Sequence, residues 1–167
     1  MKKYCIGFAG VIGSSKTPIA HYLSLKFGLP IHNNDVIRTE VTEEFGALNE
    51  EEYVKRRDAR LQEMIASGRS FILDASVDRE WQTMKEAGAK AGYSIFLISL
   101  DLSRGMLEKL YHAKGYDRSL QLLDKFFGDH EVFLNEHGAD IGLHLNDEQF
   151  SDRLRLSHEA VEKWLAT

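Results

Sequence analysis

The feature that most constrains the fold is residues 93–102, YSIFLISLDL, which are apolar almost throughout. A strand of this kind is buried on both faces, as strands of parallel sheets are. Shorter candidate strands lie at residues 3–9 (KYCIGFA), 29–35 (LPIHNND), 69–76 (RSFILDAS) and 139–146 (ADIGLHLN). Because stretches with helical spacing separate these runs, the sequence predicts βαβ units and an α/β fold, with a parallel sheet between helical layers.

The expected helices carry residues that are typical of helix ends. Gly28 is expected to stop the first helix, and Asn49 and Ser103 are expected N-caps. Asp78 is expected to cap the helix that follows the third strand. Residues 114–119, KGYDRS, are interpreted as a loop. The expected helices span residues 17–27, 35–45, 49–66, 79–91, 104–111, 120–137 and 151–166.

Length and composition narrow the class of protein. The chain has 167 residues, 43% hydrophobic and 28% charged, which predicts one globular domain over residues 1–167. Its one cysteine, Cys5, lies in an apolar run, so an internal disulfide is impossible and a cytoplasmic location is expected. No apolar run approaches the ~18 residues of a membrane span. The net charge of −5 disfavours a long nucleic-acid partner. The sequence leaves open whether the chain is a monomer or a homodimer.

Residues 10–18, GVIGSSKTP, nearly match the phosphate-loop pattern G-x-x-x-x-G-K-[ST]. Gly10, Lys16 and Thr17 have the required spacing, whereas Ser15 stands where the second glycine belongs. Serine keeps its N–H but lacks glycine's tolerance of positive φ. If this position is helical, the serine costs little; the sequence leaves the value of φ open. The other interpretation is a glycine turn with a capping serine and a surface lysine.

The position of the loop favours the phosphate site, because the loop follows a strand and opens a helix. In such loops the backbone N–H groups wrap the β-phosphate. Lys16 would reach the β- and γ-phosphates, and the hydroxyl of Thr17 would bind Mg²⁺. The candidate nucleotide-binding residues are Gly10, Val11, Ile12, Gly13, Ser14, Ser15, Lys16 and Thr17.

Acidic residues follow the apolar parts of two of the candidate strands. Asp74 ends the run FIL, where a phosphate-loop protein holds Mg²⁺ directly or through water. Asp35 follows the second strand, with Arg38 one helical turn later on the same face. A kinase needs a carboxylate for the acceptor hydroxyl and a cation near the phosphates or the acceptor. Helix capping and a local ion pair are the alternative interpretations.

Other polar residues give weaker signals. Arg104, Lys109, Lys114 and Arg118 are candidate cations for the far side of the phosphates, and Arg118 is the favoured one. Two further sets are interpreted as ordinary surface residues. These are the arginines 56, 57 and 60, as a solvated face, and the histidines 130, 137 and 144, as scattered on the surface rather than gathered around a metal.

In this chain a first strand is followed, in order, by the segments GVIGSSKT, NNDVIR and FILDAS. With this order of segments the chain resembles the P-loop kinases of the AAA_33 and zeta-toxin-like group, which are related to adenylate kinase and polynucleotide 5′-hydroxyl kinases. The resemblance implies a three-layer αβα P-loop NTPase fold with a five-stranded sheet of order 2-3-1-4-5. It implies that Lys16 and Thr17 bind phosphates and Mg²⁺, that Asp35 activates the acceptor hydroxyl, and that Arg38 contacts the acceptor or its phosphate. Ser15 and a lid with few arginines depart from the group's pattern.

The sequence thus predicts a kinase that uses ATP and Mg²⁺ and phosphorylates a hydroxyl of a small-molecule or nucleotide-like acceptor. Its catalytic residues would be Lys16, Asp35, Arg38 and Arg118, with Thr17 and Asp74 on the metal. The acceptor would bind to helices within residues 36–66, and residues 104–137 would form a lid. Two alternatives remain open: an ATP-binding or ATP-hydrolysing regulatory or toxin-like module, and an α/β domain that binds no nucleotide.

Overall fold

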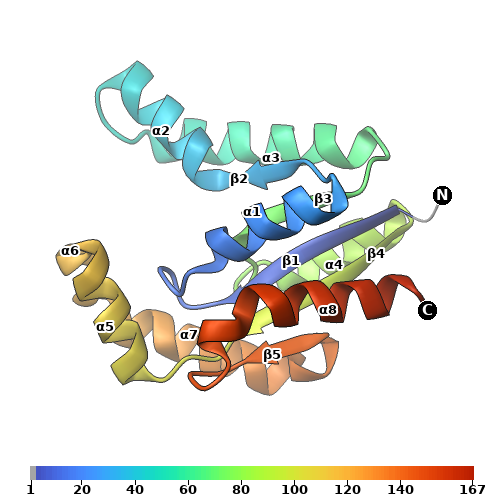
Figure 1. Ribbon diagram of the computed structural model, residues 1–167. Helices are drawn as coiled ribbons and strands as arrows, with labels where there is room; N and C mark the ends of the chain where they lie inside the picture. Colours follow the sequence, from blue (N-terminus) through green and yellow to red (C-terminus); the bar gives the residue numbers. More distant parts are fainter. Residues whose placement is uncertain (1–2) are drawn as a thin grey trace.

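The computed structural model describes residues 3–167 and contains a five-stranded parallel sheet. The strands lie in the order β2-β3-β1-β4-β5, which Figure 1 shows from one side of the sheet. The expected α/β fold and the sheet order 2-3-1-4-5 are confirmed. The strands are β1 (Lys3–Gly10), β2 (Ile31–Asn33), β3 (Phe71–Ser76), β4 (Tyr93–Leu100) and β5 (Leu143–Leu145).

Helices cover both faces of the sheet because the strands are apolar on both faces. On one face, Ile6 and Phe8 of β1 pack with residues of α1 and α8, such as Leu23 and Val161. On the other face, residues of β1 and β3 pack with α3, α4 and α7. The helices are α1 (Lys16–Phe27), α2 (Asn34–Phe45), α3 (Glu50–Ala66), α4 (Trp81–Lys90), α5 (Arg104–Lys114), α6 (Asp117–Leu120), α7 (Leu123–His137) and α8 (Arg153–Leu165).

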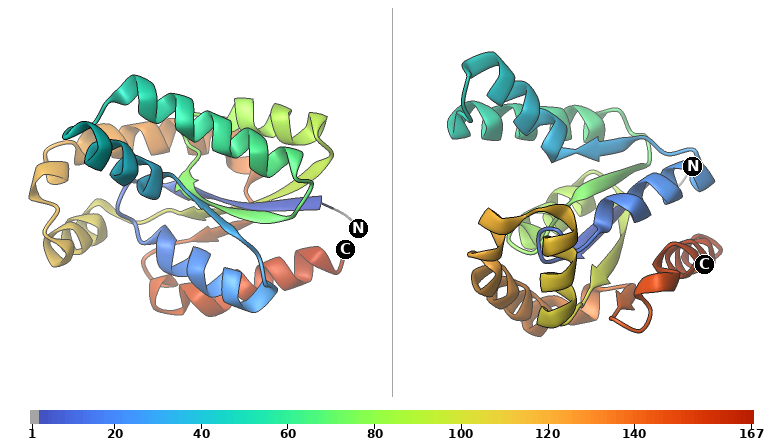
Figure 2. Two further views of the ribbon diagram at one scale, coloured as in Figure 1. Left: turned by 90° about the horizontal axis from the view of Figure 1, so that it is seen from above. Right: turned by 60° about the vertical axis from the view of Figure 1, so that its left-hand side comes forward.

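The turns at the carboxyl edge of the sheet bring distant segments together. The loop after β1, the start of α2 and the segments after β3 and β4 all lie at this edge, since the strands are parallel. Figure 2 shows α5 beside the loop that joins β1 to α1. Helices α2 and α3, here called the acceptor-side arm after the role that the sequence predicts for them, share a small cluster of their own, which contains Ile37, Val41 and Tyr53. No helix within residues 3–167 is long and apolar enough to cross a membrane.

Most expected helix ends are confirmed. The side chains of Asn49 and Ser103 accept N-cap hydrogen bonds, and Gly28 ends α1 in the left-handed conformation. The cap expected at Asp78 is wrong: α4 begins at Trp81, and Asp78 bonds elsewhere, as described below. The expected loop at residues 114–119 is also wrong for most of its length, because Lys114 still belongs to α5 and α6 begins at Asp117.

Candidate active site

The loop between β1 and α1 is compact and enfolds its own lysine. Lys16 is buried, and its Nζ donates to the carbonyl oxygens of Gly10 at 2.9 Å and Val11 at 2.8 Å. The Ser14 hydroxyl, also buried, accepts a third hydrogen bond at 3.2 Å. Burial lowers the pKa of Lys16 to about 8, although the charges of Asp78 and Asp74 oppose this shift. The ammonium group therefore lies inside the loop rather than on a solvated surface.

Ser15 adopts the conformation that glycine favours. Its φ of 73° and ψ of 41° lie in the left-handed region, and it is the one non-glycine residue within residues 3–167 with a positive φ. For a residue with a Cβ this conformation costs about 1–2 kcal/mol. The serine is therefore strained where the phosphate-loop pattern has glycine. Its Oγ accepts a hydrogen bond from Lys114 Nζ at 2.9 Å.

Helix α5 holds the loop from outside. The hydroxyl of Tyr111 donates to the carbonyl of Ile12, and Lys114 Nζ donates to the carbonyl of Gly13 at 2.6 Å. The Tyr111 ring leaves no room for a side chain on Gly13, because a Cβ there would lie 2.7 Å from the ring. The sequence named Lys114 among four candidate cations but did not predict this contact.

Thr17 and Asp74 lie together beside the loop, as the motif predicts for residues that share a metal. Thr17 Oγ1 donates to Asp74 Oδ1 at 3.2 Å, and Asn33 Nδ2 donates to Asp74 Oδ2 at 2.8 Å. The pKa of Asp74 is raised above its usual value. Burial and the charge of Asp35 raise it, and the hydrogen bond from Thr17 opposes them. The sequence did not single out Asn33, although the strand register places it directly beside Asp74.

Asp35 and Arg38 lie on the first turns of α2 but have different neighbours. The backbone N–H of Asp35 donates to Asn33 Oδ1 at 2.7 Å, so the residue that binds Asp74 also fixes the start of α2. The Arg38 guanidinium instead lies 4.7 Å from the centre of the Tyr53 ring and 3.9 Å from Glu50. Both contacts of Arg38 thus lie within the acceptor-side arm.

The remaining candidate cations have varied surroundings. Arg104 pairs with Glu108 and Asp124 on the surface. The side chain of Arg118 lies outside the described residues. Arg153, which the sequence did not indicate, begins α8, and its guanidinium lies 4.1 Å from the centre of the Phe150 ring. Burial lowers the pKa of Lys114, and the nearby charge of Arg153 lowers it further.

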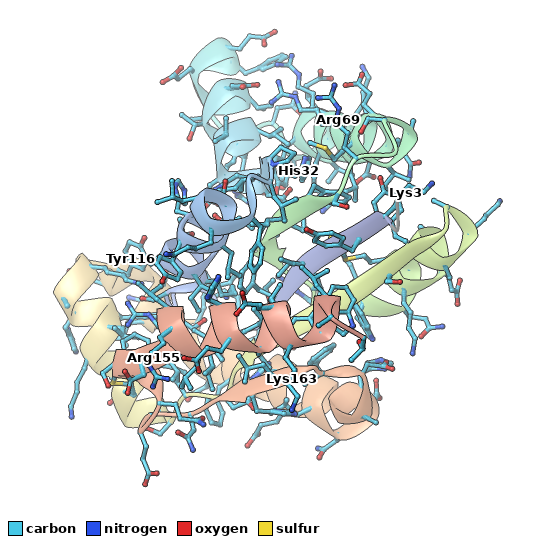
Figure 3. All side chains as sticks on the ribbon, turned by 45° about the vertical axis from the view of Figure 1, so that its right-hand side comes forward. Lys3, His32, Arg69, Tyr116, Arg155 and Lys163 are labelled. Atoms are coloured by element: carbon cyan, nitrogen blue, oxygen red, sulfur yellow. The ribbon has the colours of Figure 1, made fainter. Side chains whose placement is uncertain are left out.

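The arginines of the acceptor-side arm form ion pairs. Arg56 pairs with Glu44 and Glu52, Arg57 with Asp58 and Glu80, and Arg60 with Glu40. His32 of β2 lies buried beneath this arm (Figure 3). Burial lowers its pKa and the charge of Arg60 lowers it further, although the side chain of Asn34 opposes the shift.

The interpretation of the histidines as scattered surface residues is wrong for His130. Its side chain is only 5% exposed and bonds to two carboxylates: Nδ1 lies 2.8 Å from Asp78 Oδ2, and Nε2 lies 3.1 Å from Asp101 Oδ1. His144 also bonds to Asp101, at 2.5 Å. The sequence did not indicate these contacts, because the histidines and the two aspartates lie on separate segments that meet only in the folded chain.

The residues of the loop fit a polyphosphate and Mg²⁺. Within the described chain, no side chain caps the N-terminus of α1 and no acidic residue lies in its first turn. The positive end of this helix dipole is therefore open to an anion. Thr17 Oγ1 and Asp74 Oδ1 are hard oxygen ligands of the kind that Mg²⁺ takes. The arrangement can bind phosphate groups at the carboxyl edge of the sheet.

Solved structures share this fold, whereas the sequence comparisons find nothing: no family model and no curated protein matches the chain. A gluconokinase from Sinorhizobium meliloti superposes with a TM-score of 0.71 at 16% identity, over 98% of this chain and 94% of that one. The APS kinase of Mycobacterium tuberculosis, in complex with AMPPNP and APS, gives 0.61 at 14% identity, over 96% and 98%. Shikimate kinase from Bacteroides thetaiotaomicron gives 0.57 at 14%, over 98% and 99%. The chain therefore has the fold of P-loop kinases.

Proposed function

We propose that the protein is an ATP- and Mg²⁺-dependent kinase that transfers the γ-phosphate to a hydroxyl of a small-molecule or nucleotide-like acceptor. One observation carries this proposal: Lys16, the uncapped N-terminus of α1 and the Thr17–Asp74 oxygen pair converge on one loop. Kinases of gluconate, APS and shikimate share the fold, and that APS kinase was solved with AMPPNP. The assignment to the AAA_33 and zeta-toxin-like group remains a prediction.

On the nucleotide side, phosphate oxygens would replace the loop carbonyls as acceptors for Lys16 Nζ. The N–H groups at the start of α1 would donate to the β-phosphate. Thr17 and Asp74 would hold Mg²⁺, which neutralises charge that develops on the transferring phosphoryl group. Lys114 already reaches Gly13 and Ser15 from the lid segment. It therefore joins Arg118 as a proposed cation for the phosphates.

On the acceptor side, Asp35 would orient or deprotonate the hydroxyl. The carboxylate stands at the first turn of α2, and its charge is felt by both Lys16 and Asp74. Asn33 bonds to the Asp35 backbone N–H and to the Asp74 carboxylate, so it fixes the proposed base relative to the proposed metal ligand. Arg38 would contact the acceptor after leaving its weak, exposed pair with Glu50.

The test is transfer from γ-labelled ATP with Mg²⁺ to pooled nucleosides, nucleotides, 5′-hydroxyl oligonucleotides, sugars and amino sugars. Lys16→Ala should lose at least about 10³-fold in rate, because a charge-stabilising cation is removed. Lys26→Ala, at the exposed end of the same helix, is the matched control and should keep full activity. Asp35→Asn should abolish transfer and still bind ATP.

Three outcomes separate the hypotheses. A labelled acceptor that is lost in Lys16→Ala supports the kinase. Labelled free phosphate alone, also lost in Lys16→Ala, indicates the ATP-hydrolysing module. No labelled product together with no ATP binding contradicts both and leaves the loop as a structural turn. Normal transfer by Asp35→Asn would remove Asp35 from the mechanism.

A further inference from the structure

A partly buried hydrogen-bonded chain runs behind the phosphate loop and ends on its first residue. The backbone N–H of Gly10 donates to Asp78 Oδ1 at 3.0 Å, and Ser76 Oγ donates to the same oxygen at 2.8 Å. The other oxygen of Asp78 contacts His130 Nδ1, whose ring continues through Nε2 to Asp101. The chain thus joins the ends of β1, β3 and β4 to helix α7.

The geometry gives His130 a positive charge. A neutral imidazole has one N–H, whereas here both ring nitrogens face carboxylate oxygens that can only accept. The hydrogen bonds hold the pKa values of Asp78 and Asp101 below their usual range in spite of burial, so both are ionised. Burial acts to lower the pKa of His130, but the bonds to Asp101 and Asp78 raise it to about 9. The ring is therefore an imidazolium between two carboxylates.

This charge lies close to the phosphate loop. Among the charges that act on Lys16, that of Asp78 has the largest effect. With His130 protonated, one cation partly balances the two carboxylates. Without it, the partly buried Asp78 and Asp101 would have no balancing charge from α7 and would repel a polyphosphate. Two further titratable groups act on these carboxylates: His144 of β5, which bonds to Asp101, and Lys16, whose charge interacts with Asp78.

We propose that His130 is a positioning residue of the phosphate site: bonded to Asp78 and Asp101, it fixes the carboxylate that holds Gly10 and so couples the loop to helix α7 of the lid segment. The part of this inference that concerns nucleotide binding rests on the proposed function. The hold on Gly10 is a property of the chain itself and can be measured without any nucleotide.

Two substitutions separate the two contacts of His130. In His130→Asn the amide nitrogen lies near the position of Nδ1 and keeps the contact to Asp78. In His130→Gln it reaches the position of Nε2 and keeps only the contact to Asp101. The two variants lose the same charge and differ in the contact that remains, so each is the matched control of the other.

The first experiment measures hydrogen exchange of the Gly10 amide by NMR, relative to the Ile6 amide in the middle of β1. The Ile6 reference corrects for any loss of global stability. His130→Gln should exchange Gly10 about tenfold faster than the native chain, because the Gly10 N–H then loses much of its hydrogen bond to a charged carboxylate, and His130→Asn should stay closer to native. Equal exchange at Gly10 in both variants, fast or slow, would overturn the inference.

The second experiment uses the native chain, in case the variants fail to fold. The ring protons of His130 are titrated by NMR with and without AMPPNP and Mg²⁺. A polyanion bound in front of Asp78 should stabilise the imidazolium, so the pKa of His130 should rise on binding. An unchanged titration, with calorimetry showing that the ligand is bound, would overturn the inference. Absence of binding would instead contradict the proposed function, and the Gly10 experiment would still decide the role of His130.

Discussion

The phosphate loop and the acceptor-side arm meet at the same edge of the sheet, but they are held there in different ways. The loop is held by residues far away in the sequence: Tyr111 lies 99 positions from Ile12, and Asp78 lies 68 positions from Gly10. These contacts are buried or partly buried. Contacts within the chain therefore shape the loop, and preorganisation of this kind would favour the proposed phosphate site.

The arm relies on near neighbours and on its surface. Its own cluster contains three buried residues, Ile37, Val41 and Tyr53, and three of its four arginines pair with glutamates of the same two helices. Exposed pairs of this kind typically contribute about 0–1 kcal/mol each. We infer that the arm opens at a lower free energy than the loop does, and four predictions test this comparison.

The largest effect is expected from Tyr111→Ala. The Tyr111 side chain is fully buried and packs against Gly13, so its loss should reduce the free energy of unfolding by about 3–5 kcal/mol. Tyr111→Phe keeps the ring and loses only the bond to Ile12, which should cost about 1 kcal/mol. Urea denaturation measures both. An effect of Tyr111→Ala below that of Tyr111→Phe would show that α5 does not hold the loop by packing.

The next effect is a pH dependence of stability. Because the pKa of His130 is about 9 in the folded chain and 6.5 in the unfolded one, its contribution is complete below pH 6.5 and is lost as the pH rises through 9. Its size is on the order of 3 kcal/mol. Lys16 has the opposite effect: because its pKa is lowered to about 8 in the folded chain, its deprotonation raises the stability as the pH rises above 8.

Urea denaturation of the native chain and of His130→Gln at pH 6 and pH 9 measures this contribution. The difference in stability between the two proteins should shrink at pH 9. A Lys16→Ala background removes the opposing group. A difference that stays constant across this range would mean that His130 is not charged in the folded chain.

A smaller effect, of opposite sign, is expected from Ser15→Gly. The substitution removes the left-handed strain and should raise the free energy of unfolding by about 1 kcal/mol, less the contact to Lys114 that the hydroxyl makes. Gly13→Ala is the matched control in the same loop and should destabilise, because its φ is 82° and the Tyr111 ring occupies the space. The midpoints of urea unfolding report both signs. A destabilised Ser15→Gly would show that the hydroxyl contact outweighs the strain.

The smallest effect is expected in the acceptor-side arm. Arg60→Met removes an exposed ion pair with Glu40 and should change the free energy of unfolding by less than about 1 kcal/mol. A double-mutant cycle with Glu40→Gln isolates the pair. A coupling energy above about 2 kcal/mol would contradict the view that this arm is held less firmly than the loop.

Several features of the fold and the site follow from local patterns that can be read without a structure. Uninterrupted apolar runs such as residues 93–100 predicted the buried parallel strands, and the spacing of Gly10, Lys16 and Thr17 predicted a loop at the start of a helix. Asp74 was also predictable, because it directly follows the apolar run of residues 71–73, in the strand that pairs with β1. These predictions depend only on the apolar pattern of a strand and on the spacing of glycine and lysine, which are properties of residues close together in the sequence.

Other features depend on which distant segments pack together. Asp78 was expected to cap a helix, yet it bonds to Gly10 and His130, which come from two other elements. The contact of Lys114 with the loop depends on where α5 docks. No local pattern indicates these contacts, because their energies arise from burial and from charges that only the folded chain brings together.

By itself, the sequence determined the alternation of strands and helices, the loop with its lysine, and the acidic residues that follow the apolar parts of two strands. Only the tertiary structure decided that Ser15 is left-handed, that His130 is buried between Asp78 and Asp101, and that α5 closes on the loop. The physical reason is range: periodicity and turn chemistry act over a few residues, whereas these contacts join residues about 30 to 100 positions apart.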